Sequence, residues 1–169
     1  MGIWDQSSLL ANGDQLADLQ QSAKARVLLF DQYLRVAADQ PNGEQPNESD
    51  LFLGVIAGIP WFARRVTEVS NPSNPRKVGF SSTMRQLVTK AEALFNWHDT
   101  MPCCENCQAE TQASLGGQTR ICTSCTAEVF PRIDPAIIVS LLSEDDRLLL
   151  AHKPIWKQTR ISVLAGFVE

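Results

Sequence analysis

The stretch 101-MPCCENCQAETQASLGGQTRICTSCTAEVFPR-132 sets the architecture of the middle of this chain. It holds all five cysteines of the 169-residue sequence, and four of them form two pairs with two residues between the partners. Two thiolates at this spacing reach one metal ion from a tight turn, and a second such turn completes a tetrahedron. Thiolates are soft ligands, and Zn²⁺ accepts tetrahedral geometry without penalty. We therefore predict a four-cysteine zinc ribbon whose ligands are Cys104, Cys107, Cys122 and Cys125.

The rest of this stretch adds detail to the ribbon. Gly116 and Gly117 lie between the two pairs and would allow a tight reversal of the chain. A site closed by four thiolates has no open position, so its zinc would be structural and not catalytic. The fifth cysteine, Cys103, is predicted to be a small apolar filler beside the first ligand.

Two disulfides, or free buried thiols, are the alternatives to zinc. The first residues show no basic region followed by an apolar stretch, so we expect no signal peptide and a cytoplasmic protein. Disulfides are rare in the cytoplasm, which favours the metal. No apolar run is long enough to span a bilayer, so we expect no membrane association.

Composition and patterning divide the chain into three parts. The apolar fraction of 44% and the charged fraction of 20% are typical of a globular protein, and the net charge of −4 argues against general nucleic-acid binding. We expect an N-terminal domain over 1–100, the ribbon over 101–131, and an apolar, strand-rich segment over 132–169.

The expected elements follow from hydrophobic periodicity and strand-length apolar runs. In the first part we predict helices over 14–25 and 84–98, the second capped by Ser82 or Thr83, strands over 25–30, 51–57 and 59–69, and loops over 39–50 and 70–77. In the last part we predict strands over 135–142, 147–151 and 161–168, with a turn at 143–146. This last sheet would have an open edge, which predicts aggregation or dependence on dimerisation.

Three segments resemble the NADH pyrophosphatase family of Nudix hydrolases. They are 91-AEALFNWH-98, 130-FPRIDPAIIV-139 and 162-SVLAGFVE-169, and the cysteine pairs have the family's spacing. The stretch 51–65 is similar, less specifically, to a strand pair of the family's N-terminal domain. The resemblance implies an α+β fold with a small N-terminal α+β domain, the ribbon and the first strands of a Nudix α/β/α sandwich.

The activity implied by the resemblance is hydrolysis of the pyrophosphate of NADH or NAD⁺ to nicotinamide mononucleotide and AMP. Members of the family also remove an NAD cap from RNA. The family uses Mg²⁺ or Mn²⁺ held by carboxylates of the Nudix box, and the intact enzyme is expected to be a homodimer. Gly166 matches the first position of that box, and its glutamates are absent from this sequence. We therefore expect the front part of such an enzyme, inactive by itself.

Three further residues take roles only through the resemblance. Ala165 matches a position whose backbone carbonyl contributes to the divalent metal site, and Phe130 and Arg85 match positions that contact substrate. The alternatives are a plain strand-end alanine, a phenylalanine packed in the core, and an exposed helix arginine. The family pattern also departs at Cys103, at Gln108, where glycine is frequent, and at Val129.

Two other classes of function stay open. A zinc ribbon can serve as a binding module for protein or nucleic acid, although between 103 and 132 only Arg120 and Arg132 are basic. A degenerate pseudoenzyme could bind NAD-like ligands without cleaving them. The two histidines, His98 and His152, have no partners at ligand or triad spacing and are predicted to be structural.

Overall fold

The computed structural model describes residues 13–37, 43–75, 79–132 and 134–168. The expectations for the start of the chain, parts of the two loops and Glu169 lie outside these residues. The chain divides into two compact units, residues 1–131 and 132–169, and each is described by itself.

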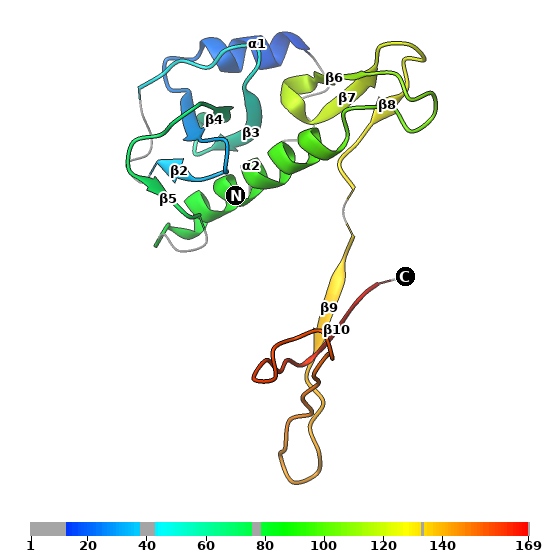
Figure 1. Cartoon of the computed structure of the whole chain (residues 1–169). Coiled ribbons are helices and arrows are strands. Elements are labelled where there is room, and N and C mark those ends of the chain that lie inside the picture. The colour runs from blue at the N-terminus through cyan, green and yellow to red at the C-terminus, as the bar shows by residue number, and fades with distance from the viewer. Residues whose placement is uncertain (1–12, 38–42, 76–78, 133, 169) are drawn as a thin grey trace. The chain divides into compact units, whose positions relative to one another are not determined.

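A five-stranded sheet forms the centre of the first unit (Figure 1). Its strands lie in the order β3-β4-β1-β2-β5, and β1 and β4 are parallel while the other neighbours are antiparallel. The strands are β1 (Arg26–Phe30), β2 (Val36–Ala37), β3 (Leu51–Ile56), β4 (Ile59–Arg65) and β5 (Pro72–Ser73). The strands predicted at 25–30, 51–57 and 59–69 are confirmed as β1, β3 and β4.

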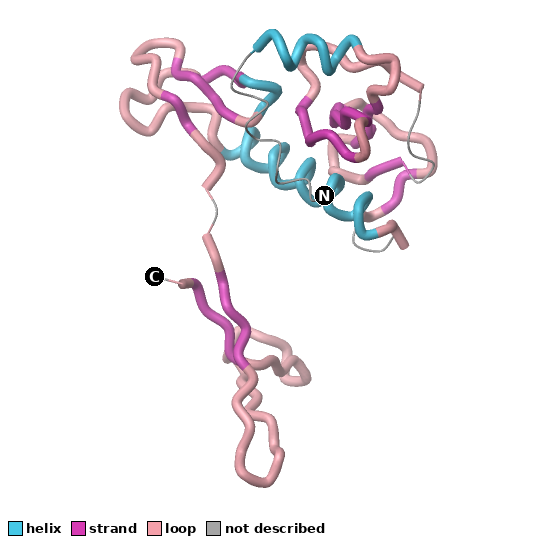
Figure 2. Tube along the Cα trace, turned by 180° about the vertical axis from the view of Figure 1, so that it is seen from behind, coloured by secondary structure: helices cyan, strands magenta, loops and turns pink. Residues whose placement is uncertain are grey.

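Helices cover both faces of this sheet. Along β1, successive side chains point to opposite faces, so Val27 packs with one buried cluster and Leu28 with the other. The helix α1 (Gly13–Gln21) contributes Leu16 and Leu19 to the first cluster. The second cluster is larger and contains five buried residues of α2 (Ser82–Thr100), namely Leu87, Val88, Ala91, Leu94 and Phe95. Figure 2 shows the two helices in cyan beside the magenta strands.

Three element boundaries differ from the prediction. The cap of α2 is Ser81, whose hydroxyl accepts the backbone N–H of Met84, and neither Ser82 nor Thr83 has this role. The helix α1 stops at Gln21 because the following residues form a turn that leads into β1. The strand β4 stops at Arg65, opposite the last residue of β1, because no partner continues beyond it.

The ribbon forms a separate three-stranded antiparallel sheet within the first unit. It comprises β6 (Thr111–Ser114), β7 (Thr119–Cys122) and β8 (Glu128–Val129). A single 3-10 turn, Leu115–Gly117, joins β6 to β7. Gly116 and Gly117 have φ of +61° and +77°, so the predicted reversal at the two glycines is confirmed.

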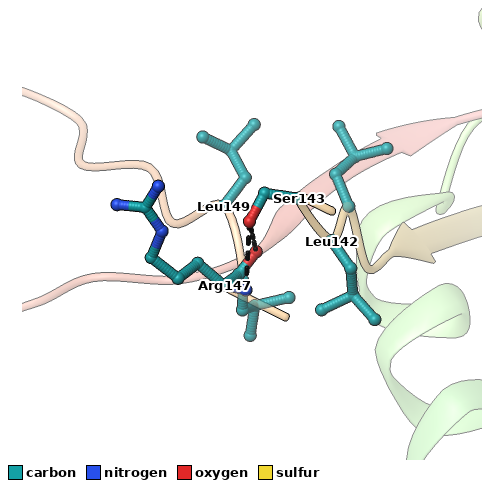
Figure 3. A pocket seen from close by; sticks show the side chains of 6 residues that line it. Leu142, Ser143, Arg147 and Leu149 are labelled. Atoms are coloured by element: carbon teal, nitrogen blue, oxygen red, sulfur yellow. Dashed lines mark hydrogen bonds between the residues drawn. The ribbon is translucent and has the colours of Figure 1, made fainter. Parts of the chain in front are cut away.

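The second unit is built on an antiparallel pair, β9 (Ala136–Val139) and β10 (Leu164–Phe167). The predicted strand at 147–151 is wrong: single bridges join Leu142 to Leu148 and Ala151 to Ser162. The short loop there has an open hollow of about 400 Å³ on its surface, and the hydroxyl of Ser143 accepts the backbone N–H of Arg147 beside it (Figure 3). The large apolar side chains of the second unit are exposed to solvent; Ile138 on β9, for example, is 76% exposed.

The architecture is thus α+β with a separate small sheet that carries the cysteines. None of the helices in the described parts of the chain is long and apolar enough to cross a membrane.

Candidate metal centre

The two cysteine turns have the same backbone geometry. In the first, the carbonyl of Cys104 accepts the backbone N–H of Gln108, and in the second the carbonyl of Cys122 accepts that of Thr126. Gln108 and Thr126 both lie in the left-handed region, with φ of +62° and +58°. Glycine adopts this conformation without strain, so Gln108 and Thr126 each carry a small backbone cost in the cysteine turns.

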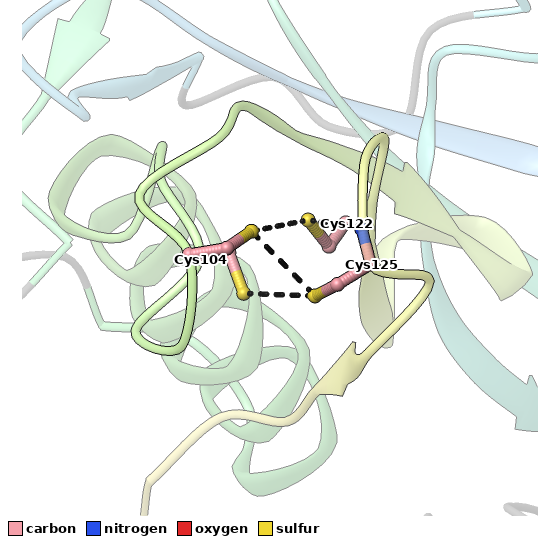
Figure 4. A group of neighbouring side chains, drawn as sticks. Cys104, Cys122 and Cys125 are labelled. Carbon is pink, nitrogen blue, oxygen red and sulfur yellow. Dashed lines mark hydrogen bonds between the residues drawn. The ribbon is translucent and has the colours of Figure 1, made fainter.

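The four predicted ligands meet at one point (Figure 4). Their sulfur atoms all lie within 4.8 Å of one another. The Sγ of Cys107 is 3.4 Å from that of Cys122 and 3.6 Å from that of Cys125, and the Sγ of Cys104 is 3.7 Å from that of Cys125. Four ligands about 2.3 Å from a tetrahedral Zn²⁺ would stand about 3.8 Å apart. The spacing of the four sulfur atoms therefore fits zinc. A search of the described residues for groups that could hold a metal ion finds this cluster.

Disulfides do not explain the cluster, because all five cysteines are free thiols in this structure. Burial alternates within it: Cys104 and Cys122 are buried, while Cys107 and Cys125 are exposed. The backbone N–H groups of Cys125 and Ser124 point at the sulfur of Cys122. These donors favour the thiolate and lower the pKa of Cys122 to about 6. A thiolate is the form that ligates a metal.

The prediction for Cys103 is wrong. Its side chain is exposed, whereas the neighbouring ligand Cys104 is buried. The two residues are adjacent on extended backbone, where successive side chains point in opposite directions, so the inward position of Cys104 places Cys103 outside.

The ribbon is attached to α2 through His98. The Nε2–H of His98 donates to the carbonyl of Gly117, with 2.9 Å between the heavy atoms, and its Nδ1 accepts Nη1–H of Arg120 at 2.6 Å. The pKa of His98 is lowered, mainly because the ring is partly buried and also because Arg120 is close. The hydrogen bond to the carbonyl of Gly117 raises the pKa and offsets part of this effect. A neutral imidazole is the only form that donates at one nitrogen and accepts at the other. His98 therefore has the structural role predicted for it.

Arg120 has a bridging role between ribbon and helix that the sequence did not reveal. Its Nε–H donates to Thr111 Oγ1 and its Nη2–H to the Thr111 carbonyl, both at 2.6 Å, so it links two ribbon strands to His98. A signal was present, because Arg120 is the only basic residue between the first and last ligand. Its partner His98 is 22 residues away in sequence, and no local pattern connects the two.

The residues assigned by resemblance lie on accessible surfaces. Phe130 is 60% exposed, which rejects the alternative of core packing for it. Arg85 is exposed on α2, and Ala165 is exposed on β10 opposite Ile138. His152, the other histidine, is exposed, and its Nδ1 lies 2.8 Å from the carbonyl of Arg160. The roles of Phe130, Arg85 and Ala165 toward substrate or metal stay predictions.

The chain is similar in sequence to proteins of known activity, although no protein-family model matches it. It is 31% identical over 176 aligned residues to the NAD-capped RNA hydrolase NudC of Mycobacterium tuberculosis, an alignment that covers 98% of this chain and 56% of the relative. Mouse NAD(P)H pyrophosphatase NUDT13 is 32% identical over 89 residues, which are 53% of this chain and 25% of that protein. Nudix hydrolase 19 of Arabidopsis thaliana is 34% identical over 86 residues, 49% of this chain and 20% of the relative.

The chain spans about half the length of the mycobacterial relative, and smaller shares of the other two. The comparisons therefore agree with the resemblance of this chain to the N-terminal portion of NADH pyrophosphatases of the Nudix hydrolases.

Proposed function

We propose that this chain supplies the N-terminal domain and zinc ribbon of a diphosphatase that cleaves the pyrophosphate of NADH or NAD⁺. The products would be nicotinamide mononucleotide and AMP, and an NAD cap on RNA is a further candidate substrate. The observation that carries the proposal is the similarity to a NAD-capped RNA hydrolase along 98% of the chain.

The ribbon's zinc would hold structure and take no part in the reaction. Its four sulfurs leave no open position for water or substrate. The ribbon has a small core of its own, so metal binding would provide much of its folding free energy. Through His98 and Arg120 the folded ribbon is fixed to α2, which would hold Phe130 on a rigid support.

The described residues do not fit the second metal of the family. Hydrolysis in the family relies on Mg²⁺ or Mn²⁺, which neutralises the diphosphate and orients a water. Such ions need several oxygen ligands, and in the described ranges no carboxylate cluster of this kind is found. We therefore assign no chemical step to this chain, and we propose that the 169-residue polypeptide does not hydrolyse NADH by itself.

Three residues of this chain would still contribute to the site. The exposed ring of Phe130 is suited to stacking on a nicotinamide or adenine base. The backbone carbonyl of Ala165 is suited to a divalent ion, and Arg85 would contact a phosphate. The exposed apolar side chains of the second unit would be covered by the remainder of a Nudix sandwich or by a second subunit, which agrees with a homodimer.

The test joins this chain to the part of the mycobacterial relative that the alignment does not cover. The purified 169-residue chain and the chimera are incubated with NADH, NAD⁺ and Mg²⁺ or Mn²⁺, and AMP is measured by chromatography. The expected result is AMP from the chimera only. A folded chimera that forms no AMP would overturn the diphosphatase proposal, and hydrolysis by the 169-residue chain would overturn the proposed inactivity.

The zinc site has its own test, with a matched pair of cysteine variants. Cys122→Ser removes a buried ligand, and Cys103→Ser changes the exposed neighbour of the cluster. We expect one zinc per chain in the unchanged protein and in Cys103→Ser, and loss of that zinc in Cys122→Ser, measured by elemental analysis. Equal zinc content in both variants would contradict the ligand set.

A further inference from the structure

A cavity of about 350 Å³ opens where the ribbon meets the N-terminal sheet and α2. The side chains that line it include three arginines: Arg64 and Arg65 at the end of β4, and Arg120 on β7. Asp99 of α2 is the one carboxylate among the lining residues. All of these residues belong to the first unit, and neither the zinc centre nor the proposed hydrolysis uses the cavity.

Arg120 brings a positive charge to this cavity that no carboxylate offsets. Its three hydrogen bonds go to neutral acceptors, namely both oxygens of Thr111 and Nδ1 of His98. In the described part of the chain it takes part in no ion pair. A guanidinium has five N–H donors, so two remain for another partner. A half-buried cation held in one orientation and without a counter-charge is costly unless an anion joins it.

Arg65 lines the same cavity and is held in one orientation. Its Nη1 and Nη2 atoms each lie 2.9 Å from an oxygen of Asp99, and its guanidinium carbon stands 4.7 Å from the centre of the Phe95 ring. These contacts hold the group in one plane. The Nε–H is buried and has no acceptor. A buried donor without a partner is uncommon in folded proteins, and a small shift of the Arg65 side chain would be needed to bring it to an acceptor.

The three carboxylates beside the cavity equal its three arginines in number, but all of them pair with Arg64 or Arg65. The buried carboxylate of Asp50 accepts two hydrogen bonds from Arg64, and Glu44 accepts a third. Asp99 is occupied by its two bonds to Arg65. Arg120 is left without a paired carboxylate, so the part of the wall beside it favours an anion.

We propose that this cavity binds a phosphate-class oxyanion, either free phosphate or the phosphate group of a small monoester, between Arg120 and Arg65. A tetrahedral oxyanion offers many acceptors in a small volume, and arginine is suited to it by its planar array of donors. Because Arg120 lies on β7 and Arg65 on β4, the site exists only while the ribbon is attached to the N-terminal domain. The inference does not depend on the diphosphatase activity.

The test is isothermal titration of the zinc-loaded 169-residue chain with inorganic phosphate, at an ionic strength held constant with chloride. We expect saturable binding at one site. Arg120→Gln and Arg65→Gln should each weaken it by about tenfold or more, because each removes a charged hydrogen-bond donor. Lys24→Gln removes one charge from an exposed side chain of the same unit and should leave the affinity unchanged.

Further measurements keep the test decisive. Zinc content and thermal unfolding identify a variant in which the ribbon no longer packs on α2. If Arg120→Gln is such a variant, Arg65→Gln tests the phosphate site, because it leaves the ribbon's own contacts intact. Titration with ribose 5-phosphate distinguishes the sources, since tighter binding than phosphate would identify a monoester as the ligand. Absence of saturable binding, or equal affinity in Arg65→Gln and Lys24→Gln, would overturn the site. An inactive chimera that still binds phosphate would reject only the diphosphatase.

Discussion

Replacing His98 with alanine should detach the ribbon from α2 and lower the stability of the first unit. The imidazole holds two groups of the ribbon at once, the carbonyl of Gly117 at 2.9 Å and Nη1 of Arg120 at 2.6 Å. In His98→Ala both lose their partner. Removing one side of a buried hydrogen bond costs about 1–3 kcal/mol.

The site is half-buried, so water partly replaces the lost partner and a cost of about 1–1.5 kcal/mol, near the lower end of that range, applies to each bond. We therefore expect the free energy of unfolding to fall by about 2–3 kcal/mol in total. For a unit of 131 residues this corresponds to a melting temperature lower by about 6–12 °C.

The assay is urea unfolding of the zinc-loaded chain, followed by circular dichroism and tryptophan fluorescence. His152→Ala is the matched control, because it removes the other histidine, which is exposed and belongs to the second unit. A surface change of this kind is expected to alter the free energy of unfolding by less than about 0.5 kcal/mol. If His98→Ala costs no more than His152→Ala, the bridging role of His98 is refuted.

Three other predictions concern the same region. In Gly117→Ala the new methyl group would collide with a side chain of β3, and the backbone φ of +77° would be strained for alanine. We expect the free energy of unfolding to fall by about 2–4 kcal/mol. Gly43→Ala is the control, because no atom lies within 4 Å of its new methyl group. Asp50→Asn leaves the half-buried guanidinium of Arg64 without its buried counter-charge and should cost about 2–4 kcal/mol in urea unfolding. The folded-state pKa of His98 lies below its ordinary 6.5, so the unfolded chain binds the proton first. Stability should therefore be complete above pH 6.5 and fall as the pH is lowered toward the folded-state value, and this slope should be reduced in His98→Ala.

Each of these predictions has a result that contradicts it. Equal stability of Gly117→Ala and Gly43→Ala would mean that the ribbon turn does not pack on β3. An Asp50→Asn protein as stable as the unchanged chain would show that solvent compensates Arg64. Protonation of the zinc-site cysteines also lowers stability in acid, but it does so in both proteins. An identical slope with and without His98 would therefore exclude the histidine as its source.

Features that depend on neighbours in the sequence were predicted well. The ligand set follows from spacing, because a two-residue gap and a tight turn bring two sulfurs to one point whatever surrounds them. The helix α2 follows from its 3.6-residue apolar period: five of the seven residues in that period are buried, and Met84 and His98 are half-buried. The strand at 147–151 failed because an apolar run becomes a strand only when a partner pairs with it.

The sequence by itself therefore determined the two cysteine turns, the main helix and the central strands of the first unit, since each rests on local geometry or on periodicity. Only the tertiary structure decided that His98 joins the ribbon to α2, and that Arg65 and Arg120 face one cavity. These contacts join residues far apart in the chain, and their existence depends on how the sheet, the helix and the ribbon pack. Side-chain partners of this kind leave no spacing or period in the sequence, because packing alone brings them together.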